Sequence, residues 1–128
     1  MSPSSFLRTA YLRERHFYRR YHTHPVNALI HVATVPLEWF STFLLVAACL
    51  SPWIAQAFGL ALAAYHLCGL GISRAAVWAT STALVGLGYA ASALAARVPR
   101  GHAATAAVVG HAVAWALQVC GARGAIMR

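Results

Sequence analysis

The chain has 128 residues, of which 60% are hydrophobic and 9% are charged, and its formal net charge is +8. Soluble domains carry charge on about 25% of their residues, so this composition excludes a surface covered mainly by water and indicates one covered by lipid. A nucleic-acid groove is not indicated either, because half of the arginines lie ahead of the first long apolar segment. Cys49, Cys68 and Cys120 stand singly in apolar segments and are interpreted as packing residues, not as a disulfide framework.

The first element expected is an amphipathic helix over residues 6–22. At about 100° per residue, its apolar and aromatic side chains fall on one arc and its basic side chains fall on the opposite arc. This arrangement is typical of a helix that lies in the interface of a membrane containing anionic lipids. A soluble helix packed on a partner protein is the alternative.

Four long apolar segments follow, and each has close to the roughly 20 residues that a membrane-spanning helix needs. The expected spans are residues 28–50, 53–72, 75–96 and 103–122. The breaks between them are short, so consecutive helices should run antiparallel as hairpins. Small residues at four-residue spacing favour close helix contacts in lipid. These pairs are Gly59/Ala63, Gly86/Ala90 and Gly110/Ala114. The expected fold is therefore an all-α polytopic membrane protein with four transmembrane helices in one domain.

The arginines at the ends of these segments predict the orientation, because Lys and Arg near short loops stay on the cytoplasmic side. With the N-terminus inside, most arginines lie at cytoplasmic ends, and only Arg97 and Arg100 lie at outer ends. Both termini should therefore be cytoplasmic. The alanine-rich composition, with arginine as the only basic residue besides histidine, favours a bacterial inner membrane over the endoplasmic reticulum.

The first span carries a polar stripe. Asn27, His31, Thr34 and Glu38 recur at spacings of three and four residues, which places an amide, an imidazole, a hydroxyl and a carboxylate on one helix face. Polar groups are costly in lipid, and ionisable ones there indicate a functional site. Pro36 should kink the helix between His31 and Glu38.

Two further imidazoles, His22 and His24, precede this stripe, and Pro25 between them and Asn27 is favourable at the first turn of a helix. Clusters of imidazole and oxygen ligands suit Fe, Zn, Cu or Ni and do not select among these metals. A set of imidazoles hydrogen-bonded between helices is the structural alternative.

The same segment contains a motif. The pattern Tyr-His-x-x-Pro-x-Asn-x-x-Ile-His-x-x-x-x-Pro is present as Tyr21, His22, Pro25, Asn27, Ile30, His31 and Pro36. It resembles the N-terminal signature of the 2-hydroxy fatty acid (2-hydroxy-palmitate) dioxygenase family of small multi-span membrane proteins. The second signature of that family, Trp-x-x-Gln-x-x-Gly-His, is matched here by Trp115, Gln118 and Gly121, with Ala122 in place of the His. The resemblance covers about residues 17–40 and 111–122, and the middle of the chain is similar only in hydropathy.

The resemblance implies an integral membrane enzyme that uses Fe(II) and O₂ to shorten 2-hydroxy fatty acids by one carbon. The candidate iron ligands are His22 and His31, completed by His66 or His24. Arg19 or Arg20 would meet the lipid carboxylate at the level of the headgroups. Asn27 is a further candidate for the catalytic site, and together with Tyr21 and Gln118 it would orient the imidazoles or a bound water. The alternative hypothesis is a catalytically lapsed member that serves as a membrane lipid-binding or interaction protein.

Glu38 and His111 are expected at similar depth. At about 1.5 Å per residue, each lies roughly 15 to 16 Å from the cytoplasmic boundary of its span, near the middle of the bilayer. Glu38 has no basic residue within its own span, and a carboxylate without a partner is costly there. We therefore predict a buried Glu38–His111 pair. The alternative is a neutral Glu38 bonded to a backbone carbonyl or a Thr hydroxyl.

Overall fold

The computed structural model describes residues 25–68 and 74–126, together with Thr9, Leu12 and Arg13. This part of the chain holds four helices and no strand, which confirms the all-α class for the described residues. The helices are α2 (Pro25–Cys49), α3 (Pro52–Leu67), α4 (Arg74–Ala95) and α5 (Arg100–Ile126). The predicted interfacial helix over residues 6–22 lies outside the described residues except for those three.

The helix boundaries follow the proline signals. Pro25 begins α2 and Pro52 begins α3, and proline is favourable at these first-turn positions because its missing N–H is not needed there. Ser51, ahead of α3, has extended backbone angles, and its carbonyl accepts a hydrogen bond of 3.1 Å from the Ile54 amide. Pro36 lies inside α2 without ending it.

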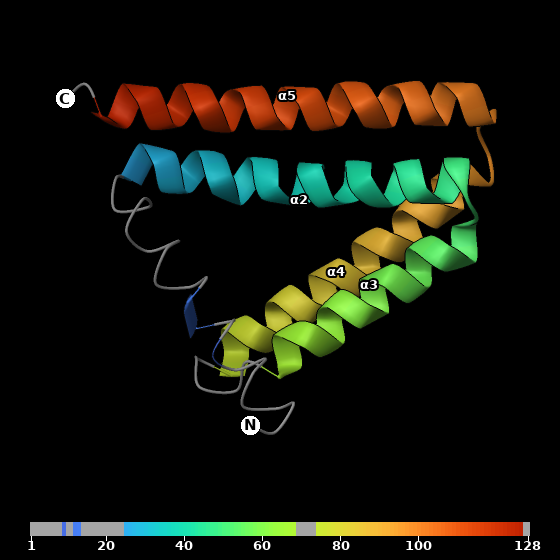
Figure 1. Cartoon of the computed structure of the whole chain (residues 1–128), viewed down its shortest axis with the longest axis horizontal. Coiled ribbons are helices and arrows are strands. Elements are labelled where there is room, and N and C mark those ends of the chain that lie inside the picture. Colours follow the sequence, from blue (N-terminus) through green and yellow to red (C-terminus); the bar gives the residue numbers. More distant parts are fainter. Residues whose placement is uncertain (1–8, 10–11, 14–24, 69–73, 127–128) are drawn as a thin grey trace.

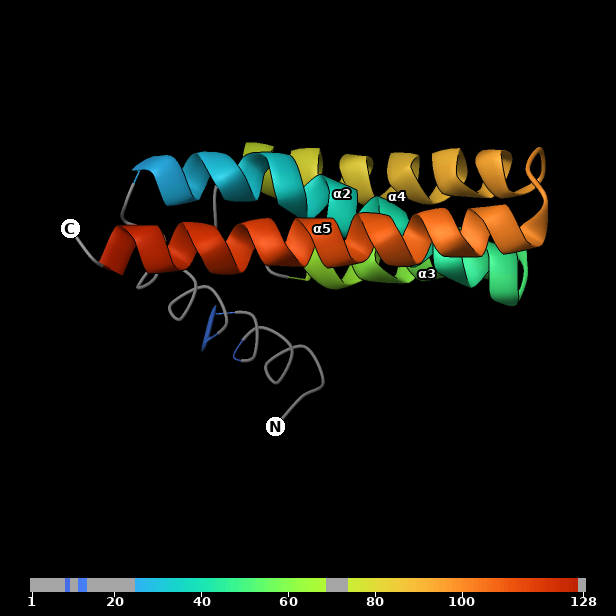
Figure 2. The same cartoon turned by 90° about the horizontal axis from the view of Figure 1, so that it is seen from above.

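The helices are arranged as two antiparallel pairs, α2 with α5 and α3 with α4 (Figure 1). The pairs lie close together at the end that holds the α2–α3 turn and the α4–α5 connection, and they diverge toward the opposite end. Viewed from above, all four helices extend along the long axis of the molecule (Figure 2). The predicted hairpin of α3 and α4 is present, whereas α2 lies along α5, which is remote from it in sequence.

An aromatic cluster fills the region where the two pairs converge. Phe43 is 0% exposed, and its ring centroid lies 5.9 Å from that of Trp39 and 5.7 Å from that of Phe58 on α3. Phe43 and Phe58 meet edge to face, a favourable arrangement for two aromatic rings. The C-terminal half of α2 is thus anchored in the core.

The seam between α3 and α4 depends on glycine. A Cβ atom added to Gly59 would lie 3.1 Å from the backbone oxygen of Leu84 and 3.8 Å from Cα of Gly88. The predicted contact at Gly59 and Ala63 is confirmed, because both are buried. The one predicted at Gly86 and Ala90 is wrong, since both are exposed and a Cβ on Gly86 would have no neighbour within 4 Å.

Serine hydroxyls complete the seam. Ser92 Oγ lies 2.8 Å from the backbone oxygen of Pro52 on α3 and 2.8 Å from that of Gly88 on its own helix, and its single proton is shared between these two acceptors. Ser81 Oγ donates a hydrogen bond of 3.2 Å to the backbone oxygen of Ala63 on α3. These bonds join the two helices near both ends, and they satisfy hydroxyls that would otherwise be costly in an apolar surrounding. The packing face of α4 therefore carries Ser81, Gly88 and Ser92, two residues away from the face that the spacing of Gly86 and Ala90 suggested.

Three of the four described helices, α2, α4 and α5, are long and apolar enough to cross a membrane. The described part of α3 has 16 residues, which at about 1.5 Å per residue is roughly 24 Å against a hydrocarbon thickness of about 30 Å. Large apolar side chains on the outer faces of the helices are exposed, as expected of surfaces that contact lipid. The structure therefore indicates an integral membrane protein, with three candidate spans among its described residues.

Candidate functional site

The two motif blocks meet at one end of the α2/α5 pair. A Cβ atom added to Gly121 on α5 would lie 2.5 Å from Cδ1 of Ile30 and 3.6 Å from Oδ1 of Asn27, both on α2. Asn27 is 3% exposed at this contact. With both termini expected on the cytoplasmic side, the start of the first span and the end of the last one should lie at the same end, and the antiparallel packing of α2 on α5 brings the two signatures there into contact (Figure 1).

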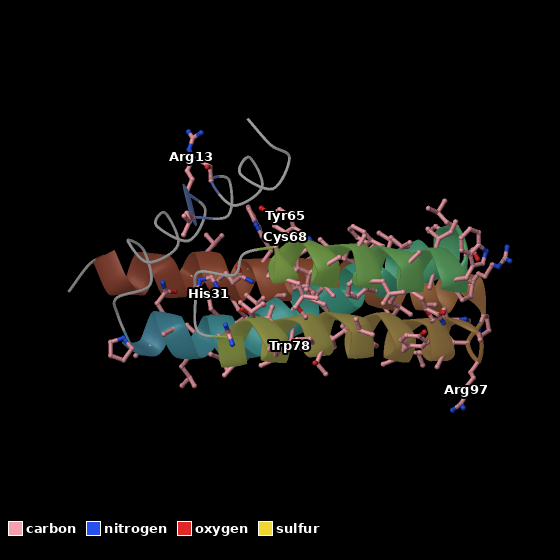
Figure 3. The ribbon with its side chains drawn as sticks, turned by 90° about the horizontal axis from the view of Figure 1, so that it is seen from below. Arg13, His31, Tyr65, Cys68, Trp78 and Arg97 are labelled. Atoms are coloured by element: carbon pink, nitrogen blue, oxygen red, sulfur yellow. The ribbon has the colours of Figure 1, made fainter. Side chains whose placement is uncertain are left out.

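His31 lies one helical turn beyond Asn27 on α2 (Figure 3). Its ring atom Nδ1 and the side-chain oxygen of Asn27 are both shielded from solvent. An imidazole and an amide on successive turns of one helix face, close to Gly121 of the second motif block, form the centre of the candidate site.

Further along the same face of α2, Glu38 has a partner on α5. Gln118 Nε2 donates a hydrogen bond of 2.9 Å to Glu38 Oε2. Because Gln118 belongs to the second motif block, this bond is a second link between the two blocks. It also gives a polar partner to the only acidic side chain in the part of the chain that the structure describes.

The predicted Glu38–His111 pair is replaced by this bond. His111 Nδ1 lies 3.5 Å from Thr42 Oγ1, and Thr42 Oγ1 itself donates a bond of 2.9 Å to the backbone oxygen of Glu38. Counting residues placed Glu38 and His111 at nearly the same depth, but depth does not fix which side chain on the facing helix points toward the carboxylate. Gln118 does so, and His111 meets the next turn of α2.

Thr42 was not among the residues that the sequence singled out. It follows Glu38 by four residues, so extending the polar stripe by one more turn would have found it. Ser41 was missed for the same reason, and it lies buried against Gly110 on α5.

His66, one of the two histidines expected to complete the ligand set, lies in the last turn of α3. Its Nδ1 donates a hydrogen bond of 2.8 Å to the backbone oxygen of Leu62. A bond of this kind fixes the tautomer in which Nε2 is the acceptor, and metal-binding histidines commonly use the same arrangement.

No three His, Cys, Asp or Glu side chains converge on one point within the part of the chain that the structure describes. Of the predicted iron ligands, the described residues include His31 and His66. Several other predicted site residues lie outside the described residues. They are Arg19, Arg20, Tyr21, His22 and His24. Helix α5 includes Ala122, directly after Gly121, where the resembled signature has a histidine.

Comparison of the chain with protein-family models, with curated proteins and with solved structures finds no match. What bears on function is therefore the chemistry of the two motif blocks and their contact across the α2/α5 pair.

Proposed function

We propose that the protein is a membrane-embedded, Fe(II)-dependent dioxygenase that shortens 2-hydroxy fatty acids by one carbon, the activity implied by the family that its two motif blocks resemble. The observation that carries the proposal is the packing of Asn27 and Ile30 on Gly121. The two blocks lie about 90 residues apart in sequence, so their contact results from the packing of α2 on α5 and not from chain connectivity. A site built from both blocks requires this contact.

The iron ligands would come from the histidines in and just ahead of the first motif block, with His66 on α3 as a further candidate. His31 has a ring nitrogen enclosed by protein, and His24 directly precedes Pro25, two residues after His22. His66 lies near the end of α3, which diverges from the N-terminal half of α2 (Figure 1), and its Nδ1 bonds its own helix. Imidazole with nearby oxygen donors is a ligand set that suits iron. Iron bound there would supply the activation of O₂.

The remaining roles belong to side chains around the histidines. Arg19 or Arg20 would bind the carboxylate of the fatty acid at the headgroup level, because a guanidinium pairs with a carboxylate through two parallel hydrogen bonds. Asn27 and Tyr21 would orient the imidazoles or a bound water. Gln118 would help to orient the imidazoles or a bound water, and its own side chain is fixed by the hydrogen bond to Glu38.

The proposed topology has four membrane-spanning helices, because α3 crosses the membrane in addition to α2, α4 and α5. An interfacial helix precedes them, and both termini lie in the cytoplasm of a bacterial cell. The distribution of arginine supports this topology. Arg97 and Arg100 flank the connection between α4 and α5, at the end remote from His31 (Figure 3).

A second candidate function is a catalytically lapsed relative that binds lipid or another membrane protein. Ala122 favours it, because alanine cannot bind a metal at the position where the resembled signature has a histidine. The described residues also lack three converging metal-binding side chains.

The iron content of the protein purified in detergent tests the first candidate. We expect the wild type to bind iron and His31→Ala to lose most of it, because each imidazole contributes separately to affinity. The matched control is His102→Ala, which removes an exposed histidine near the start of α5 and should leave the iron content unchanged. Full iron occupancy in His31→Ala would contradict the proposal.

Restoring the missing histidine separates the two candidates. If Ala122 marks a weakened but functional site, Ala122→His should raise the iron content or the turnover of 2-hydroxy-palmitate. If wild type and Ala122→His both lack iron and turnover, the lapsed relative is the better description. Binding of 2-hydroxy-palmitate without turnover would then identify it as a lipid-binding protein.

A further inference from the structure

The N-terminal half of α2 stands apart from α3 and α4. Helices α3 and α4 diverge from it (Figure 1), and side chains on the face turned away from α5 are exposed, with Leu29 70% and Val32 73% exposed. By contrast, Phe43 in the C-terminal half is 0% exposed. The motif residues Asn27 and His31 therefore lie on a section of α2 whose described helical neighbour is α5.

The C-terminal end of α5 is likewise distant from the connection that joins α5 to α4. Its N-terminal end is joined to α4 by residues 96–99, whereas Gly121 lies about 30 Å away along the helix, at roughly 1.5 Å per residue from Arg100. Contact between α4 and α5 is slight compared with that between α2 and α5. The docking of the second motif block on the first thus depends on the α2/α5 seam itself.

The α5 side of this seam is built mainly from small residues, which are Ala103, Ala107, Gly110, Ala114 and Gly121. On α2, the side chains nearest to Gly110 and Gly121 are those of Ser41, Leu37, Ile30 and Asn27. A face of small residues lets two helices approach closely. In lipid, however, the hydrophobic effect does not favour one register of such helices over another. The glycine contacts are soft as well, because the atoms nearest to a Cβ on Gly110 or Gly121 belong to side-chain ends that can rotate.

The Glu38–Gln118 bond, at 2.9 Å, is a polar link in this seam on the side of the motif blocks, whereas the 3.5 Å contact of His111 with Thr42 lies on the side of Gly110. The Glu38–Gln118 bond lies between the contact of Ser41 with Gly110 and the contact of Ile30 with Gly121. Breaking it would leave a carboxyl group and an amide without partners in an apolar surrounding, which is costly. Single polar pairs of this kind are known to fix the register of helices whose apolar contacts do not.

We propose that Glu38 and Gln118 are positioning residues, whose hydrogen bond clamps the C-terminal end of α5 onto the N-terminal half of α2 and so holds the two motif blocks in contact. The clamp divides the seam into two sections. The section on the side of Gly110 is also held by the α4–α5 connection and the aromatic core. The section on the side of Gly121 depends on the clamp.

Two disulfide reporters, placed on either side of the clamp in a protein whose three native cysteines are replaced by alanine, test the proposal. Ser41→Cys with Gly110→Cys reports the proximal section, and a Cβ on Gly110 would lie 3.8 Å from Cβ of Ser41, a separation that suits a disulfide. Ile30→Cys with Gly121→Cys reports the section that carries the motif blocks. Oxidation is measured in native membranes, so the readout needs neither iron nor turnover.

We expect Glu38→Leu and Gln118→Leu to lower the rate of the 30–121 cross-link by roughly threefold or more, the factor that corresponds to an average polar contact between membrane helices. The 41–110 cross-link should stay unchanged, which also shows that the fold is retained. Exchanging the partners, Glu38→Gln with Gln118→Glu, should restore the 30–121 rate, because a carboxyl and an amide again face each other. The matched control is Gln56→Leu, which removes the glutamine of α3.

The proposal is overturned if both leucine variants keep the wild-type 30–121 rate, if both cross-links fall together, or if the exchanged pair behaves like the single variants. Should Glu38→Leu fail to accumulate in the membrane, Gln118→Leu and the exchanged pair decide the question. The inference deepens the proposed site and rests on the proposed membrane location of α2 and α5. If the protein binds no iron, the positioning role of Glu38 and Gln118 is unaffected. If the leucine variants leave the 30–121 cross-link unchanged, the proposed iron site is unaffected.

Discussion

At the scale of single residues, spacing identifies which side chains share a helix face but not which face is packed. Gly59 with Ala63 and Gly86 with Ala90 have the same spacing, yet Gly59 is buried against α4 and Gly86 is exposed. The polar stripe shows the same limit. Its spacing correctly placed Asn27, His31 and Glu38 on one side of α2, but the partner of Glu38 depends on how α5 is rotated against that side.

Substitution of these glycines should separate the two environments. Gly59→Ala should lower the free energy of unfolding by about 1–3 kcal/mol, because the new methyl group would press on the backbone oxygen of Leu84, which cannot rotate away. Gly86→Ala is the matched control. It meets no neighbour and should raise stability by about 0.5–1 kcal/mol through the better helix propensity of alanine.

Thermal or denaturant unfolding in detergent measures both variants. Equal effects at Gly59 and Gly86 would mean that the close approach of α3 and α4 at Gly59 does not exist in the membrane protein.

At the scale of elements, the ends of the helices follow local signals. Pro25 and Pro52 begin α2 and α3, and the expected spans 28–50 and 75–96 are matched by α2 and α4 to within a few residues. Helix α5 runs beyond its expected end at residue 122, because a hydropathy profile marks the apolar part of a helix and does not detect polar turns that continue it. Helix α3 ends at Leu67, five residues before its expected end at residue 72.

Whether α3 crosses the membrane can be tested with the native cysteines at its two ends. Cys49 is the last residue of α2, Cys68 follows α3, and both are exposed. If α3 is the fourth span and the N-terminus is cytoplasmic, a membrane-impermeant maleimide should label Cys49 in right-side-out vesicles and Cys68 only after the vesicles are opened.

The measurement uses two variants, each with a single one of these cysteines and the others replaced by alanine. Labelling of both cysteines from the same side would show that α3 enters the membrane without crossing it.

At the scale of the whole molecule, the structure is two helix pairs joined at one end, with apolar side chains turned outward on every helix. Their joint is aromatic, at Trp39, Phe43 and Phe58, and the opposite end carries the two motif blocks. This separates a packed end, which holds the fold together, from an open end, where the chemistry is proposed.

The outward apolar surface predicts behaviour in extraction. The protein should remain in the membrane pellet through an alkaline carbonate wash and enter the supernatant only with detergent, because its candidate spans expose large apolar side chains on their outer faces. Release by carbonate alone would contradict the assignment as an integral membrane protein.

The class of the molecule follows from its composition, because a 60% hydrophobic fraction with 9% charge leaves few ways to satisfy the backbone other than helices in lipid. The polar side of α2 follows from the sequence as well, since the spacing of Asn27, His31 and Glu38 fixes that face through helix geometry alone. The pairing of α2 with α5, the packing of Gly88 instead of Gly86 on Gly59, and the bond of Glu38 with Gln118 instead of His111 are visible only in the folded structure. Lipid leaves all the outer faces of these helices nearly equivalent, so hydropathy does not select a partner. The choice depends on close backbone contacts and on a few hydrogen bonds between residues distant in sequence.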